Sequence, residues 1–320
     1  MESILIVNAS IVSDGDIFGG DVYIEAGRIA QLGSDLASRS ADRVIDARGK
    51  VLLPGMIDDQ VHFREPGLTH KGDLVTESRA AVAGGITSYM EMPNTDPPTT
   101  TLARLEKKFQ SAAGRSYANY SFYLGGTNDN LQEIKALDPR ESCGIKVFMG
   151  SSTGNLLVDD MDALASIFAR SPVIVATHCE DDTLIDANAR RCREKYGEDV
   201  PMSEHPRIRS EESCYRSTHR AVALAREHGT HLHILHLTTA RELSLLSDRP
   251  LDEKKITAEV CVHHLFFDET AYGSKGTHIK CNPAIKSPAD RQALLQAVAD
   301  DRIDIIATDH APHTLEEKQR

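Results

Sequence analysis

From residue 56 to residue 308 the chain alternates short apolar segments with helix-like segments, and this alternation limits the folds it can adopt. The apolar segments have the length and composition of buried parallel strands. Eight strands are expected, at residues 56–62, 86–92, 118–124, 144–149, 173–178, 231–237, 256–262 and 303–308. Helices are expected between them, among others at residues 72–83, 101–113, 159–170, 207–228, 239–247 and 287–300. Repeated β-α units in this number predict an α/β fold with a closed (β/α)8 barrel.

A glycine-rich segment precedes this alternation and contains short strand-like stretches without helical segments between them. Residues 3–12, 21–25 and 43–53 read as short strands, with glycines between them. We expect a small antiparallel β module over residues 1–53, followed by the barrel over residues 54–320.

The two ends of the alternation refine this prediction. An open doubly wound sheet would carry a glycine-rich phosphate loop after its first strand, and none follows residues 56–62. The last expected strand ends at Thr308, which leaves little room for an eighth helix before Arg320. We therefore expect that a C-terminal part of the fold is missing from this chain and that, without it, the N-terminal module is an incomplete β-sandwich.

Charge and cysteine usage exclude several classes of protein. The net charge is −12 and no run of Lys and Arg appears, which argues against a nucleic-acid-binding surface. Neither a secretory signal nor a window of about 20 apolar residues is present, so we expect no membrane span. The cysteines form no CxxC pair, which favours reduced, buried thiols in a cytoplasmic protein. They are Cys143, Cys179, Cys192, Cys214, Cys261 and Cys281.

Polar side chains gather at the carboxyl ends of the expected strands, where barrels carry their active sites. A barrel interior normally holds Val, Ile and Leu, so several imidazoles with a lysine and an aspartate are costly there unless they are paired or bind a cation. Histidines together with a carboxylate match the ligands of Zn²⁺. The residues are Gln60, His62 and Arg64 around the first strand, Asn94 after the second, Lys146 in the fourth, His178 and His236 at the fifth and sixth, Asn282 after the seventh, and Asp309 with His313 after the eighth.

The motifs around these residues resemble those of the type I dihydroorotases of the amidohydrolase superfamily, a group that also includes hydantoinases and allantoinases. The resemblance covers the chain from about residue 50 onward. It is carried by Leu53-Pro54-Gly55-Met56-Ile57-Asp58-Asp59-Gln60-Val61-His62-Phe63-Arg64-Glu65-Pro66-Gly67, Met92-Pro93-Asn94-Thr95, Gly144-Ile145-Lys146-Val147-Phe148-Met149, His178-Cys179-Glu180-Asp181, Ile234-Leu235-His236, Asn282-Pro283 and Thr308-Asp309-His310-Ala311-Pro312-His313.

The resemblance implies one or two zinc ions per chain, with a carbamylated lysine as the bridging ligand. That lysine would be Lys146, because residues 150–155 offer no acid that could bridge the metals instead. The implied metal ligands are His62, Lys146, His178, His236 and Asp309. Gln60 departs from the pattern, since it stands where the family has a histidine, and a neutral amide oxygen is a weak zinc ligand at best.

The implied reaction is the interconversion of N-carbamoyl-L-aspartate and L-dihydroorotate in de novo pyrimidine biosynthesis. Arg64, Asn94 and His313 match residues that hold the substrate carboxylate, and Asn282 matches a residue near the ring. An arginine fork suits a carboxylate, although Arg64 could instead pair with Glu65. Asp309 would be the catalytic proton carrier to the leaving nitrogen.

Two other functions remain open from the sequence. A hydantoinase or allantoinase would use the same metal site on a different cyclic amide. A catalytically silent subunit that scaffolds aspartate transcarbamoylase is suggested by Gln60. A cytoplasmic homodimer that acts on a small molecule, with aspartate transcarbamoylase as a candidate partner, completes the expectation.

The remaining histidines receive no ligand role. Three of them, His263, His264 and His310, follow strands. The others are interpreted as structural or surface residues: His70, His205, His219, His228, His231, His233 and His278.

Overall fold

The computed structural model describes residues 2–150 and 156–319 and divides into two compact units, Met1–Met56 and Ile57–Arg320. The smaller unit is one sheet in which β3, β2, β1 and β4 lie in this order and β5 also pairs with β1. The strands are β1 (Ile4–Ser13), β2 (Asp16–Glu25), β3 (Arg28–Gly33), β4 (Arg43–Asp46) and β5 (Val51–Leu52).

The pairing in this sheet differs from the expected antiparallel arrangement. β1 to β3 are antiparallel, but β4 and β5 run parallel to β1, so the sheet is mixed. A turn at residues 47–50 divides the expected strand 43–53 into β4 and β5. β3 was not predicted, because its residues are exposed and carry little of the burial pattern that marks a strand.

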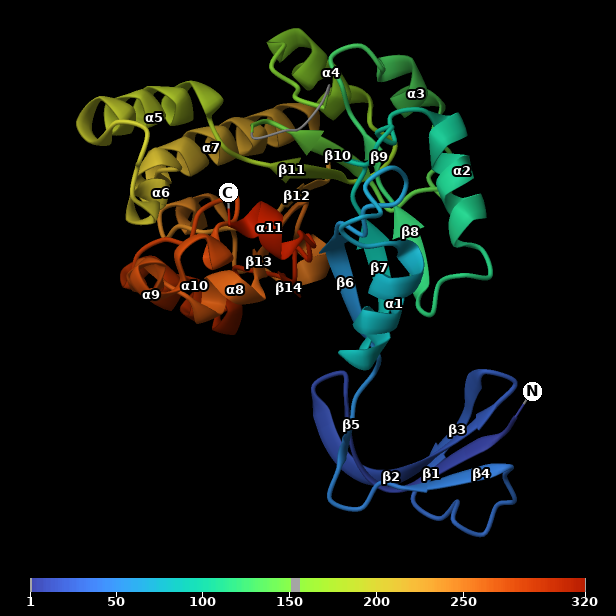
Figure 1. The fold of residues 1–320 in the computed structure, drawn as a ribbon. Coiled ribbons are helices and arrows are strands. Elements are labelled where there is room, and N and C mark those ends of the chain that lie inside the picture. Colours follow the sequence, from blue (N-terminus) through green and yellow to red (C-terminus); the bar gives the residue numbers. More distant parts are fainter. Residues whose placement is uncertain (1, 151–155, 320) are drawn as a thin grey trace. The chain divides into compact units, whose positions relative to one another are not determined.

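The larger unit contains the predicted barrel (Figure 1). Its parallel strands form two sheets, with the order β6-β7-β8 in one and β14-β13-β12-β11-β10-β9 in the other. β8 and β9 are two halves of one predicted strand, interrupted at Tyr123, so the described residues supply the eight predicted strands. Their bounds are β6 (Met56–Val61), β7 (Ile86–Glu91), β8 (Asn119–Phe122), β9 (Leu124–Gly125), β10 (Ile145–Phe148), β11 (Val175–His178), β12 (Leu232–Ile234), β13 (Ile256–Cys261) and β14 (Ile305–Ala307).

The first and last strands come together and nearly close the barrel. Val61 and His310 form a parallel bridge, and the backbone N–H of His62 donates to the carbonyl of His310 at 2.8 Å. The buried carboxylate of Asp58 accepts from the Thr308 backbone N–H at 3.2 Å and from its hydroxyl at 2.5 Å. The predicted (β/α)8 architecture is therefore confirmed.

Helices cover the outside of the barrel, and most of the predicted ones are present. Their bounds are α1 (Leu74–Ala83), α2 (Leu102–Ala112), α3 (Leu131–Ala136), α4 (Met161–Arg170), α5 (Asp182–Tyr196), α6 (His205–Ile208), α7 (Glu211–His228), α8 (Val262–Phe266), α9 (Tyr272–Lys275), α10 (Pro288–Ala299) and α11 (Leu315–Lys318). The 3₁₀ turns are Met202–Glu204, Glu242–Leu245, Leu251–Glu253, Glu269–Ala271 and Gly276–Ile279.

Two helical segments differ from expectation, each for a physical reason. The helix expected at residues 239–247 is only the 3₁₀ turn Glu242–Leu245, because the buried Glu242 carboxylate accepts from the hydroxyls of Thr218 and Thr239 and thereby fixes a local turn. α5 was not among the helices named from the sequence, since only Ile185 of its residues is buried and its apolar stripe is weak. Across the described residues, no helix combines the length and the apolar character that crossing a membrane requires.

We predict that Asp58→Ala lowers the free energy of unfolding by about 2–4 kcal/mol, because the half-buried Thr308 donors lose their acceptor. Chemical denaturation followed by circular dichroism measures the change. Asp248→Ala, at an exposed position, is the control and leaves the midpoint unchanged. Equal midpoints for both variants would show that Asp58 does not stabilise barrel closure.

Candidate metal centre

The ends of the adjacent strands β6 and β14 bring His62 and Asp309 together. His62 Nε2 lies 3.0 Å from Asp309 Oδ1, and His62 Nδ1 lies 2.6 Å from the amide oxygen of Asn94. An amide oxygen only accepts, so Nδ1 carries the ring proton. Burial lowers the pKa of His62 although Asp309 acts to raise it. The neutral ring therefore directs the lone pair of Nε2 at a carboxylate, an arrangement that a cation between them stabilises.

The neighbouring strands β11 and β12 supply a second pair. His178 Nδ1 lies 3.0 Å from His236 Nε2, and both side chains are buried. His178 Nε2 lies 2.9 Å from the Glu180 carboxylate, which also accepts from Arg209 at 2.5 Å. Because Glu180 holds the proton on Nε2, the lone pair of His178 Nδ1 points at His236. Burial, with the charges of His178 and Lys146, holds the pKa of His236 well below its ordinary value.

Lys146 on β10 lies near both pairs. It is 1% exposed, and its charge contributes to lowering the pKa of both His62 and His236, so it is close to both. Burial lowers the pKa of Lys146 to about 8, against the opposing charges of Asp309 and Glu259. Within the described residues its ammonium group forms no ion pair, and its nearest recorded partner is the ring of Phe148, 4.6 Å from Nζ.

Backbone conformation marks the same region. Arg64, His236 and Asp309 have φ angles of 72°, 40° and 46°, in the left-handed region that side chains other than glycine rarely adopt. Each such conformation costs of order 1–3 kcal/mol and persists where the surroundings impose it, commonly at functional sites. Three of the residues predicted from the sequence are thus held in unusual backbone geometry at the ends of their strands.

The donor set of this centre fits zinc. Metal-binding histidines usually donate their outer ring N–H to an oxygen, as His62 does to Asn94 and His178 does to Glu180. The inner nitrogens then face a carboxylate or another imidazole, and neutral imidazoles with a carboxylate are ligands that Zn²⁺ prefers. His236 Nδ1 is buried without a hydrogen-bond partner in the described part of the chain. The residues therefore fit one or two such ions near Lys146.

Gln60 is not brought into this centre by any recorded contact. Its side chain is 1% exposed, and its amide oxygen lies 3.9 Å from the sulfur of Cys261. Among the residues that the structure describes, no hydrogen bond joins the Gln60 side chain to His62 or Asp309. Its weak ligation remains a prediction, and residues 151–155, which bear on the prediction for Lys146, lie outside the described residues.

Two of the predicted substrate residues, Arg64 and His313, lie near one another. Arg64 is buried and donates from Nε to the carbonyl of Pro312 at 3.2 Å, while Glu65 pairs with Arg115 at 2.6 Å. The alternative pairing of Arg64 with Glu65 is therefore not formed. His313 is exposed, and burial together with the charge of Arg64 lowers its pKa, which places the two side chains near one another.

Asn94 and Asn282, also predicted to bind substrate, are placed differently from each other. The amide oxygen of Asn94 is occupied by His62, which leaves its NH₂ group for a ligand. Asn282 is exposed in the segment that follows the 3₁₀ turn Gly276–Ile279. No contact that the structure records joins the described Asn282 to the other predicted residues.

Two features of the centre were missed from the sequence. Glu180 lies two residues after His178, a spacing that puts alternate side chains on one face of a strand and could have identified it. The other is the buried set Asp59, His233 and Glu259, in which His233 Nε2 lies 3.3 Å from both carboxylates. His233 was interpreted as a structural or surface residue, and its burial between two acids from other strands is consistent with the structural role.

Comparisons with known proteins agree with this geometry. The family model of dihydro-orotase-like proteins matches residues 49–242. The dihydroorotase of Pediococcus pentosaceus is 34% identical over 98% of this chain and 73% of its own length, and that of Methanosarcina mazei is 33% identical over 99% and 71%. Among solved structures, the L-hydantoinase of Arthrobacter aurescens has a TM-score of 0.93 at 27% identity, covering 100% of this chain and 71% of that one.

We predict that Glu180→Gln weakens zinc binding by roughly 10- to 100-fold, because the amide no longer fixes the His178 proton on Nε2. Competition with a chromophoric chelator measures the affinity. Glu198→Gln, at an exposed position, is the matched control and binds zinc as the wild type does. Unchanged affinity in Glu180→Gln would remove Glu180 from the support of this centre.

Proposed function

The chain belongs to the dihydro-orotase-like family, and from this premise we propose that it is a dihydroorotase, a metal-dependent hydrolase of cyclic amides that interconverts L-dihydroorotate and N-carbamoyl-L-aspartate in pyrimidine biosynthesis. The observation that carries the proposal is the pairing of His62 with Asp309 and of His178 with His236, with buried Lys146 near both pairs. Arg64 at the mouth adds the cationic group that a carboxylated ring requires.

We infer that His62, Lys146, His178, His236 and Asp309 hold one or two zinc ions, with Lys146 carbamylated. The metal would supply a water of lowered pKa and would polarise the ring carbonyl. Burial of Lys146 supports its modification, since a lysine amine kept partly neutral is the form that attacks CO₂. The resulting carbamate would replace an unpaired buried ammonium by an anion that suits the site.

Asp309 is the residue we assign to proton transfer. Burial acts to raise its pKa, but the adjacent His62 ring and the positive charge of Lys146 hold the pKa below its ordinary value. The side chain is therefore a carboxylate at neutral pH and can accept the proton of the attacking water. In the hydrolytic direction Asp309 would then give this proton to the ring nitrogen of dihydroorotate as the amide bond breaks.

Substrate orientation is assigned to Arg64, Asn94 and His313, with Asn282 near the ring. The guanidinium of Arg64 uses only Nε on the Pro312 carbonyl among its recorded hydrogen bonds. Its two terminal NH₂ groups can therefore present a fork to the carboxylate of dihydroorotate. The NH₂ group of Asn94, held in place by the bond from His62, can donate to the same carboxylate.

We also propose a cytoplasmic homodimer that associates with aspartate transcarbamoylase. A catalytically silent subunit that only scaffolds this partner is the second candidate, and the orientation of Gln60 toward Cys261 instead of toward His62 favours it. A hydantoinase is the third, because several similar solved structures carry that name. These alternatives differ in metal content and in substrate.

We predict that the zinc-loaded protein hydrolyses L-dihydroorotate at least tenfold faster than hydantoin or allantoin. Absorbance assays on the three substrates, with metal content measured on the same sample, give the result. Removal of metal abolishes turnover and zinc restores it, whereas Lys146→Ala stays inactive. Turnover of hydantoin alone would support the hydantoinase, and a metal-free, inactive chain would support the scaffold.

A second prediction separates substrate binding from chemistry. Arg64→Gln should lower kcat/KM for dihydroorotate by roughly 100-fold, since a lost charge-assisted contact costs about 2–3 kcal/mol. Any residual hydrolysis of hydantoin, which has no carboxylate, should stay within about twofold of the wild type. Arg79→Gln, at an exposed position on α1, serves as the control. An equal loss on both substrates would show that Arg64 supports the fold and not the carboxylate.

A further inference from the structure

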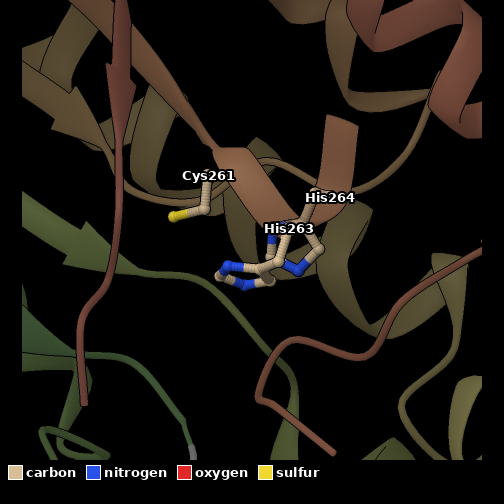
Figure 2. A group of neighbouring side chains, drawn as sticks. All are labelled: Cys261, His263 and His264. Atoms are coloured by element: carbon tan, nitrogen blue, oxygen red, sulfur yellow. The ribbon is translucent and has the colours of Figure 1, made fainter. Parts of the chain in front are cut away.

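A second group of metal-binding side chains lies at the end of β13, among residues to which no role has been assigned. Cys261 is the last residue of β13, and His263 and His264 follow in the short helix α8. One candidate ligand atom from each residue lies within 4.8 Å of the other two. Figure 2 shows the two imidazole rings side by side with the Cys261 sulfur on the same side of the helix. Their ring centroids are 4.1 Å apart.

Two ring nitrogens of this group lack, among the described residues, the hydrogen-bond partners that buried polar atoms normally have. His264 is 3% exposed, and its Nε2 donates to the carbonyl of Pro283 at 3.2 Å, so Nδ1 carries a lone pair. That Nδ1 and the Nε2 of His263 are both buried without a hydrogen-bond partner in the described residues. An unpaired buried polar group costs about 1–3 kcal/mol, and a cation between these two nitrogens would remove that cost for both.

The Cys261 sulfur limits the chemical class of the species that this group can bind. Cys261 is fully buried, and burial raises the pKa of its thiol well above the ordinary value, which makes it a poor nucleophile. A disulfide is not formed, since Cys261 is a free thiol. One sulfur and two imidazole nitrogens are, however, ligands that select Zn²⁺ or a similarly soft cation.

Gln60 stands beside this group. Its amide oxygen lies 3.9 Å from the Cys261 sulfur, within reach of a fourth coordination position. Asp309 lies close enough for its charge to act on both His263 and Cys261, so the group borders the hydrolase centre but shares none of its proposed ligands.

We propose that Cys261, His263 and His264 bind a zinc ion of their own, with the Gln60 amide oxygen available as a fourth ligand. This site goes beyond the proposed hydrolase function. It would give His263 Nε2 and His264 Nδ1 the partner that each lacks among the described residues.

Cobalt(II) tests the proposal, because only a cobalt ion bound to a thiolate shows a near-ultraviolet sulfur-to-metal charge-transfer band. The full-length chain, stripped of metal by a chelator under reducing conditions, is titrated with cobalt chloride. We expect the wild type to show the band and to bind one more equivalent of cobalt than Cys261→Ala, which lacks the band. Cys214→Ala, another buried cysteine away from the group, is the matched control and keeps both.

Two further variants keep the test decisive. His263→Gln, at a half-buried position that tolerates substitution, should weaken the band-forming site at least tenfold if Cys261→Ala does not fold. Lys146→Ala should lose hydrolase activity and keep the band, which separates this proposal from the proposed function. Absence of the band in the wild type at saturating cobalt, or its persistence in Cys261→Ala, would overturn the proposal.

Discussion

The structure depends on how buried charge is neutralised inside the barrel. Side chains on β10, at the ends of β6, β11 and β12, and in the segment after β14 place three imidazoles, a lysine and a carboxylate in a region where water is largely excluded. Transfer of an unpaired ion into such a region costs several kcal/mol, which far exceeds the contribution of one apolar contact. A cation shared between strands would remove this cost, and it would also join strands that are distant in the sequence.

Buried histidines take two forms in this chain: one is a protonated cation between carboxylates, and others are neutral rings that offer lone pairs. His233 lies between the carboxylates of Asp59 and Glu259, and although burial alone would lower its pKa, the hydrogen bonds with both acids raise it to about 9. This imidazole keeps its proton and acts as the cation itself. His62 and His236 have lowered pKa values and offer lone pairs instead. The acids around each ring thus decide whether it acts as an ion or as a ligand.

Much of the barrel could be predicted because its strands are buried on both faces and appear as continuous apolar runs, and the site could be predicted because strand ends converge. The hydrogen-bond and ion-pair partners that only tertiary contacts bring together could not be predicted. Nothing near His233 in the sequence shows that Asp59 and Glu259 lie within 3.3 Å of its ring. The exposed strand β3 and the polar helix α5 carry too few buried residues for a pattern, and the turn at Glu242 is fixed by hydroxyls from elsewhere.

Gln60 connects these observations. An amide at position 60, where the dihydroorotase pattern has a histidine, would leave the centre around Lys146 with one ligand fewer. The Gln60 side chain is buried and must satisfy its oxygen in the interior. The nearest recorded group is the Cys261 thiol, a weak donor at 3.9 Å, too poor to justify burying an amide by itself. A cation held by Cys261 and the two histidines of α8 would accept that oxygen as a ligand. The loss of one histidine on β6 and the unpaired nitrogens at the end of β13 then have a single physical explanation.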